Sequence, residues 1–226
     1  MRPRVAIVDD HELLAQTLRA ALTAEGLEVD VPVLTNPRSV LGQLRADPAD
    51  VVLLDLHLGG FGRGEDLVAP LVATGARVII VTGSSNQMQN ARCIELGAHG
   101  IVDKTRPFEE LLRVVLDAAN LRAIISQQQR SRLLGELRDH RRRVRERLAP
   151  FRALTPRESK VLAALCDGLS VQTIAARWFV SEATVRSQVR GVLSKLGVSS
   201  QIAAVAAAQK AAWSLDAIRE ADRDNS

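Results

Sequence analysis

Three carboxylates near the start of the chain each follow a short, mostly apolar run. Asp9 and Asp10 come directly after residues 4–8, and Asp55 comes directly after residues 51–54. Like charges held close together raise each other's pKa unless a cation is present, so a divalent metal ion is the natural partner of these groups. Two carboxylates and a backbone carbonyl can hold Mg²⁺, which prefers oxygen ligands. The remaining carboxylate can then attack phosphorus and form an acyl phosphate.

Two later apolar runs end in groups that suit the same chemistry. Residues 78–81 lead to Thr82, and residues 100–102 lead to Lys104 two positions further on. A hydroxyl and an ammonium group can bind phosphoryl oxygens. Ligands of open α/β sheets bind outside the carboxyl ends of the strands. All five side chains would stand there if these runs are strands.

The elements needed to position these residues are present as alternating strand-like and helix-like segments. The apolar runs, bounded by polar residues, are typical of strands buried in a parallel sheet. Helical spacing of apolar residues is found over residues 11–25, 37–45, 65–73 and 86–96 and again after Pro107. A further strand over residues 28–34 is expected at a sheet edge, because Pro32 has no amide hydrogen. Five such repeats predict an α/β, flavodoxin-like (βα)5 domain over residues 1–120.

The strand-end residues resemble the site of receiver domains in two-component response regulators, over residues 4 to about 118: Asp9, Asp10, Asp55, Thr82 and Lys104. The resemblance implies that Asp55 accepts a phosphoryl group from a histidine kinase and stands at a Mg²⁺ site. It implies that Asp10 ligates the ion directly and that Asp9 acts largely through water. The backbone carbonyl of His57 would complete the protein ligands.

The resemblance also implies that Thr82 hydrogen-bonds the phosphoryl group and that Lys104 pairs with its oxygens. Three features bear on how such a site works here. Ile101 stands where the family usually has an aromatic switch residue, and Leu58-Gly59 stands where the family usually has Met-Pro. His11 is expected to start a helix and not to ligate the ion, because neighbouring carboxylates favour a hard cation.

The segment 121–150 is expected to be a helical connector that runs on from the last receiver helix. It has no proline before Pro150 and one glycine, Gly135. Two short apolar seams, out of step with each other, suggest a stuttered coiled coil: Leu121, Ile124, Ile125 and Gln128, then Leu134, Leu137, Val144 and Leu148. A dimeric coiled coil and a single solvated helix both remain open. The basic run 141–147 is either a solvated face or a contact to phosphates.

The back of the chain predicts an all-α domain of four helices over residues 151–215. Thr155, Pro156 and Glu158 form a helix start with a capping box. Ser170 caps a short helix, and Ser181 caps a helix that reaches Leu196. Two helices joined by a tight turn indicate a helix-turn-helix. A charged tail over residues 216–226 is expected to be flexible.

Residues 152 to 213 resemble the LuxR-type DNA-binding domain, so the whole chain resembles the NarL/FixJ family of transcription regulators. The resemblance rests on these residues: Leu154–Glu158, Val161-Leu162, Gly168, Ile174-Ala175, Val180-Ser181, Thr184-Val185 and Lys195–Gly197. In the second helix of the motif, spacing predicts a buried stripe of Val185, Val189, Val192 and Leu196.

The resemblance assigns base-edge contacts to Arg186, Ser187 and Arg190, and phosphate contacts to Ser181, Thr184, Gln188 and Lys195. Gln188 stands in place of a frequent family histidine, and Gly191 in place of a frequent asparagine. Trp178 and Phe179 are expected in the core, because double-stranded DNA offers them no unstacked bases.

Composition fits two soluble domains with different partners. The net charge of +4 divides into −4 over residues 1–129, +5 over residues 130–150 and +3 over residues 151–226, which favours a nucleic-acid partner for the back half. Cys93 and Cys166 are far apart, so a reducing compartment is expected. There is no visible signal peptide and no run of about 18 apolar residues, and a cytoplasmic location follows.

The sequence therefore predicts a DNA-binding transcriptional response regulator, not an enzyme. Phosphorylation of Asp55 would favour a homodimer able to bind paired half-sites in double-stranded DNA. One alternative is a constitutively dimeric or ligand-controlled regulator, favoured by Ile101. Another is a Mg²⁺-dependent phosphatase, disfavoured because His57 stands where such enzymes generally have a second acid.

Overall fold

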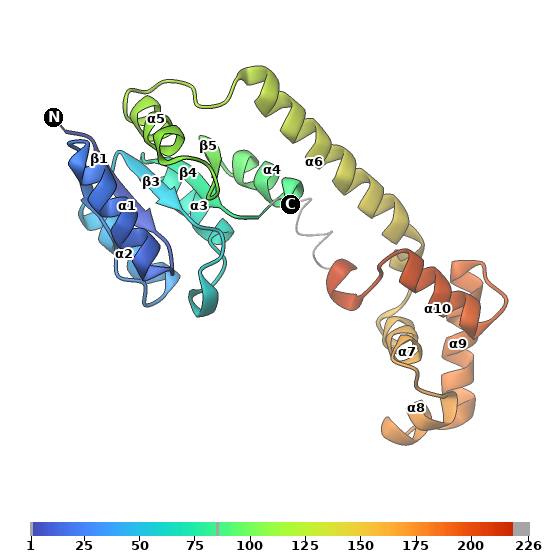
Figure 1. Cartoon of the computed structure of the whole chain (residues 1–226). Coiled ribbons are helices and arrows are strands. Elements are labelled where there is room, and N and C mark those ends of the chain that lie inside the picture. Colours follow the sequence, from blue (N-terminus) through green and yellow to red (C-terminus); the bar gives the residue numbers. More distant parts are fainter. Residues whose placement is uncertain (1, 85, 219–226) are drawn as a thin grey trace. The chain divides into compact units, whose positions relative to one another are not determined.

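The computed structural model describes residues 2–84 and 86–218, which divide into two compact units, one up to Leu137 and one from Arg138 (Figure 1). Most of the predicted tail, residues 219–226, lies outside the described residues. Within the described part of the chain, no single helix is long and apolar enough to cross a membrane. Only α9 (Glu182–Leu196) and α10 (Gln201–Lys210), taken together across a 54° bend, reach that length and composition.

The first unit is built on a five-stranded parallel sheet. Its strands are β1 (Arg4–Val8), β2 (Glu28–Asp30), β3 (Val51–Leu54), β4 (Arg77–Thr82) and β5 (Gly100–Asp103). Their order is β2-β1-β3-β4-β5, which is a flavodoxin-like order and confirms the predicted fold class. The short β2 lies at the edge, as Pro32 predicted. Since all pairs are parallel, the carboxyl ends of the strands share one edge.

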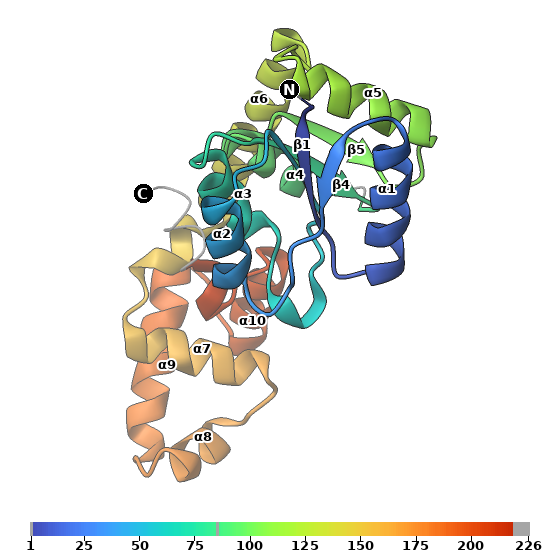
Figure 2. The same ribbon diagram turned by 90° about the vertical axis from the view of Figure 1, so that its left-hand side faces the viewer.

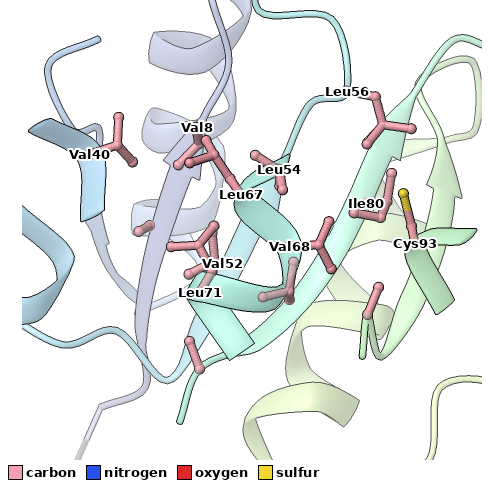
Figure 3. Close-up of a cluster of buried hydrophobic side chains, with 14 of the residues drawn as sticks. Val8, Val40, Val52, Leu54, Leu56, Leu67, Val68, Leu71, Ile80 and Cys93 are labelled. Atoms are coloured by element: carbon pink, nitrogen blue, oxygen red, sulfur yellow. The ribbon is translucent and has the colours of Figure 1, made fainter. Parts of the chain in front are cut away.

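Helices cover both faces of this sheet (Figure 2). The helices are α1 (Glu12–Ala24), α2 (Pro37–Ala46), α3 (Glu65–Val72), α4 (Gln87–Glu95) and α5 (Phe108–Ala119). Alternate strand residues face opposite ways, so two cores form. Leu54 and Ile80 pack with Leu71 of α3 and Cys93 of α4 (Figure 3). On the other face, Ile7, Leu53 and Ile79 pack with residues of α1 and α5.

The connector does not continue α5, so the expected unbroken helix is wrong. α5 ends at Ala119, and Leu121 has a φ of 59°. The amide of Arg122 donates to the carbonyl of Asp117 at 2.8 Å, and that of Leu121 donates to Ala118 at 2.9 Å. This pair of bonds is a left-handed helix end. A new helix, α6, begins only at Gln127 and ends at Leu148.

Two residues of the first connector seam, Ile124 and Ile125, and the start of α6 pack on the first unit. Ile125, Leu133 and Leu134 join the core under α3 and α4, and Ile124 joins the other core. A Cβ placed on Gly100 would lie 2.5 Å from a methyl group of Ile124. The connector therefore fits closely against the beginning of β5.

Polar contacts hold the same segment, and the second seam is divided between the units. Arg130 donates to the carbonyl of Ile94 at 3.0 Å, and Gln87 donates to Glu136 at 2.6 Å. Val144 and Leu148 belong to a core of the second unit. Much of the apolar surface that the coiled-coil hypothesis assigned to a second chain is thus used within this one.

The second unit is helical, as predicted (Figure 1). It contains the end of α6, a 3₁₀ turn (Ala149–Ala153), and the helices α7 (Pro156–Cys166), α8 (Val171–Arg177), α9 and α10. The caps predicted at Thr155, Ser170 and Ser181 are confirmed, since each side chain accepts a backbone hydrogen bond at a helix start. Ser200 caps α10 in the same way. Gly197 ends α9 with a φ of 65°, a conformation that glycine adopts without strain.

Two small cores stabilise these helices. Phe151 stacks on Trp213 with 5.6 Å between ring centroids, and Val192 of α9 lies buried in the same core. Val185 and Val189 bury the other part of α9 against α7 and α8. The predicted stripe of α9 is confirmed for its three valines, and Leu196 packs at the margin.

The expectation that Trp178 and Phe179 lie in the core is wrong. Phe179 is 96% exposed and Trp178 is 38% exposed. Both stand in the turn between α8 and α9, where Phe179 has a φ of 54°. The amide of Val180 donates to the carbonyl of Ala175 at 3.0 Å, which ends α8 and points the turn away from the core.

Candidate functional site

The strand-end residues of the first unit meet at the carboxyl edge of the sheet. Nζ of Lys104 donates to Oδ2 of Asp9 at 2.7 Å and to Oδ2 of Asp55 at 2.9 Å. Both carboxylates are buried, with Asp9 6% and Asp55 3% exposed. Burial acts to lower the pKa of Lys104, but the bonds to the two carboxylates outweigh it and leave that pKa raised. The ammonium group therefore stays charged and links the two acids.

Asp10 supplies the third carboxylate of this group. Oxygens of Asp9, Asp10 and Asp55, with a ring nitrogen of His11, lie within 4.8 Å of one another. Oδ1 of Asp10 is buried and accepts no hydrogen bond from the described residues, although Nδ1 of His11 is 2.9 Å away. A buried carboxylate oxygen that lacks a hydrogen bond fits a site for a hard cation. The ring of His11 thus stands closer to the acids than the sequence indicated.

The glycine-rich loop after β3 approaches these acids closely. Gly59 has a φ of 53°, and a Cβ there would lie 2.7 Å from Oδ2 of Asp10. A Cβ on Gly64 would lie 2.0 Å from the backbone oxygen of Asp55. His57 is exposed and forms an isolated β-bridge with Arg63. Glycine is therefore needed at two points where the loop backbone shapes the site.

Thr82 ends β4 beside this site. Its side chain is buried, and its Oγ1 accepts a hydrogen bond from the amide of Ser84 at 3.1 Å. In the sheet register, Leu54 pairs with Ile80 and Ile80 pairs with Ile101. Ile101 is partly buried against the core that Ile125, Leu133 and Leu134 of the connector also join.

In the second unit, α9 presents a polar surface opposite its valine stripe. Arg186, Ser187 and Arg190 are exposed, as their spacing predicted. Arg186 donates to Glu182 at 2.9 Å, whereas Arg190 has no such acidic partner among the described residues. Ser181 and Thr184 share a hydrogen bond of 2.8 Å at the helix start. The exposed side of α9 thus offers donors along two turns.

Lys195 differs from these residues because its ammonium group has an acidic partner on another helix. Its Nζ donates to Oε2 of Glu158 at 2.7 Å, and the same oxygen accepts the amide of Thr155 at 2.7 Å. A Cβ on Gly191 would lie 2.3 Å from Oε1 of Glu158. Burial acts to raise the pKa of Glu158, but the bonds from Lys195 and Thr155 prevail and lower it. The sequence reveals the capping box but not the partner of Lys195, which is on another helix.

A surface pocket of about 360 Å³ lies beside α9 in the second unit. Its lining residues are Arg157, Lys160, Val161, Trp178, Val180, Thr184, Val185 and Gln188. Two of them, Thr184 and Gln188, are among the predicted phosphate contacts. Arg157 and Lys160 come from α7, and the sequence did not indicate either of them as a DNA contact, because single exposed cations on a helix form no recognisable pattern.

Two family models match the chain in the order that the two units have. The response regulator receiver domain matches residues 5–116, and the luxR family of bacterial regulatory proteins matches residues 152–208. A nitrate/nitrite response regulator protein homolog of Haemophilus influenzae is 31% identical over 204 residues, which cover 89% of this chain and 93% of that protein. The nitrate/nitrite response regulator protein NarP of Escherichia coli is 34% identical over 204 residues, 89% of this chain and 92% of that protein.

The crystal structure of a LuxR-family two-component response regulator from Aurantimonas is similar in fold, with a TM-score of 0.51, 23% identity, and coverage of 61% of this chain and 99% of that one. The chain belongs to the LuxR-type response regulators, in which a receiver domain is joined to a helix-turn-helix DNA-binding domain. Its relatives of this kind are transcriptional regulators of the NarL and NarP type.

Proposed function

We propose that this chain is a cytoplasmic transcriptional regulator that a histidine kinase phosphorylates on Asp55, and that phosphorylation promotes dimerisation and operator binding. The observation that carries the proposal is the bond of Lys104 to both Asp55 and Asp9 in a buried acidic cluster. A phosphoryl group on Asp55 would bring new oxygens to the same ammonium group. Lys104 would then exchange carboxylate for phosphoryl oxygens, which are stronger acceptors.

The acidic cluster fits Mg²⁺ by its donor set and by the oxygen of Asp10 that lacks a hydrogen bond. Asp10, Asp9 through water, Asp55 and the backbone carbonyl of His57 would hold the ion. When bound, it would neutralise charge on the transferred phosphoryl group. Gly59 leaves the space that Asp10 occupies.

Thr82 is the residue on β4 proposed to hydrogen-bond the phosphoryl group. Its hydroxyl already accepts a bond from Ser84, so its hydrogen is free to be donated. A shift of this hydroxyl toward Asp55 would pull on the segment that leads to α4. Near its middle, α6 is hydrogen-bonded to the first residue of α4, because Gln87 donates to Glu136. This contact gives the receiver a path to the connector that does not need an aromatic residue at Ile101.

For the second unit, we propose that α9 enters the major groove of duplex DNA. Arg190 and Arg186 would read base edges with Ser187, and an arginine bound to guanine is worth about 1–3 kcal/mol of discrimination. Ser181, Thr184 and Gln188 would contact phosphates. Lys195 keeps only a secondary role in this proposal, since it is bound to Glu158.

A second candidate is a regulator that does not depend on phosphorylation. It is favoured by Ile101, which stands at the usual aromatic position and is partly buried beside the connector residues. In that case the connector would set the assembly state whatever the state of Asp55.

The test is the solution mass of the full chain by light scattering, with and without Mg²⁺ and beryllofluoride, a phosphoryl mimic. We expect a monomer that becomes a dimer, with a matching rise in affinity for DNA, and neither change in Asp55→Ala. Equal mass and equal DNA affinity in all samples would reject phosphorylation control and favour the second candidate. Failure to bind any duplex DNA would reject the regulator itself.

A further inference from the structure

The turn between α8 and α9 exposes apolar side chains on a strained backbone. Phe179 has a φ of 54° and is 96% exposed, so it gains nothing from packing. A residue other than glycine or asparagine in this conformation loses free energy. Trp178 and Val180 on either side are 38% and 41% exposed. Such a combination points to a contact outside the unit, where the aromatic ring would be covered.

The charge around the turn indicates what would cover it. The pocket beside it is lined by Trp178 and Val180 together with Arg157 and Lys160, and no acidic residue lines it. Neither cation has an ion pair within residues 2–84 and 86–218. Thr184 and Gln188, which also line the pocket, belong to the side of α9 proposed to contact phosphates. The turn and the pocket therefore extend that side of α9 without a break.

We propose that this surface binds the sugar–phosphate backbone of one DNA strand beside the recognition helix. Arg157 and Lys160 would pair with phosphates, and Phe179 and Trp178 would cover deoxyribose carbons or a thymine methyl group. The proposal rests on DNA binding by α9 and adds a second line of contact to it. Base stacking is not involved, because a duplex offers no unstacked base.

The decisive variant is Phe179→Gly in the full chain. Glycine removes the ring and also adopts the positive φ freely, so we expect the urea midpoint of the second unit to stay unchanged or rise. Affinity for a mixed-sequence DNA duplex, measured by fluorescence anisotropy of labelled DNA, should fall about 5- to 10-fold because a buried apolar contact is lost. Phe179→Leu, which restores an apolar side chain, should recover most of the affinity.

The matched control is Leu121→Gly. Leu121 is also apolar, 75% exposed and at a positive φ of 59°, but it belongs to the first unit. We expect the DNA affinity of Leu121→Gly to equal that of the unchanged chain.

The role of the cations is tested by Lys160→Ala. This variant should bind all DNA sequences more weakly, and the slope of log affinity against log salt concentration should be smaller by about 0.9.

The outcomes separate this surface from the recognition helix. If Arg190→Ala weakens DNA binding while Phe179→Gly and Lys160→Ala leave it unchanged, the surface proposal is overturned and the regulator stands. If Phe179→Gly lowers the solution mass of the chain but not its DNA affinity, the surface serves a second copy and the proposal is also overturned. If the unchanged chain binds no duplex, the proposed function itself fails.

Discussion

Glu158 holds two helices of the DNA-binding domain together, and its replacement is a direct test of that geometry. Its carboxylate accepts the amide of Thr155 at the start of α7 and the ammonium group of Lys195 on α9, each at 2.7 Å. Glu158 is 7% exposed. Gly191 provides the space for it, since a Cβ there would lie 2.3 Å from Oε1.

The expected loss follows from these contacts. Removal of the capping bond in Glu158→Ala costs about 1 kcal/mol. Loss of the ion pair adds up to about 1 kcal/mol, because the side chain of Lys195 is 34% exposed and partly screened. The buried stem of the side chain adds about 1 kcal/mol. We therefore expect a total near 2–3 kcal/mol for Glu158→Ala, and about 1 kcal/mol for Glu158→Gln, which keeps an oxygen for the cap.

Tryptophan fluorescence makes the assay specific to this domain in the full chain. The chain has two tryptophans, Trp178 and Trp213, and both follow Arg138. With a urea dependence of roughly 1 kcal/mol per molar for a domain of this size, the midpoint of Glu158→Ala should fall by about 2–3 M. The urea midpoint of Lys195→Ala should fall by about 1 M. A shift of less than about 0.5 M in Glu158→Ala would refute the reasoning.

The stability difference between the unchanged chain and Glu158→Gln should depend on pH in a defined direction. The pKa of Glu158 is lowered in the folded chain, so its bonds stabilise the domain above the ordinary glutamate range. This contribution is lost as the pH falls through the folded pKa. The stability gap between the unchanged chain and Glu158→Gln should therefore be full at pH 7 and close under acid conditions. A gap that persists there would contradict the assigned charge state.

The remaining predictions concern the first unit. Gly100→Val should displace Ile124, because a methyl group of Ile124 lies 2.5 Å from the Cβ position. Protease cleavage and amide exchange in the connector just before α6 should therefore increase. Unchanged rates of cleavage and exchange would refute the contact. Burial, with help from Arg77 and Arg130, lowers the pKa of His99, so the receiver should lose stability as the pH falls below about 6.5. His99→Gln should remove that part of the loss, measured by far-ultraviolet circular dichroism, and an unaltered pH profile would count against it.

Local patterns predicted most of the fold and the receiver site. Apolar runs that end in Asp9, Asp55 and Thr82 specify buried strands, and their parallel order brings the ends to one edge. Helix caps such as Thr155 and Ser181 bond to residues three positions further along the chain, so they can be predicted from the sequence. The bond of Lys104 to both acids follows from the same edge arrangement.

Features that depend on contacts distant in the sequence were missed. Apolar spacing in the connector is equally suited to packing against a second chain and to packing in the chain's own cores. Only the structure shows that Ile124 and Leu148 pack in the chain's own cores. The break at Leu121 has no glycine or proline to mark it. The sequence predicted Phe179 in the core because duplex DNA offers it no unstacked base, whereas the turn that ends α8 leaves its side chain 96% exposed.

Gly191 shows how a departure from a family pattern can be misinterpreted when one position is considered alone. Gly191, compared alone with the frequent asparagine, looks like a lost phosphate contact. In the structure its missing side chain is the space that Glu158 fills on its way to Lys195. Gly100 likewise leaves space for a neighbouring side chain, that of Ile124. Gly191→Asn should therefore not improve DNA binding: it should push Glu158 from Lys195 and destabilise the domain by about 1 kcal/mol or more, since one charged pair is broken. If Gly191→Asn binds DNA as tightly as the unchanged chain or more tightly, with an unchanged urea midpoint, then Gly191 is not needed to make space for the Glu158 side chain.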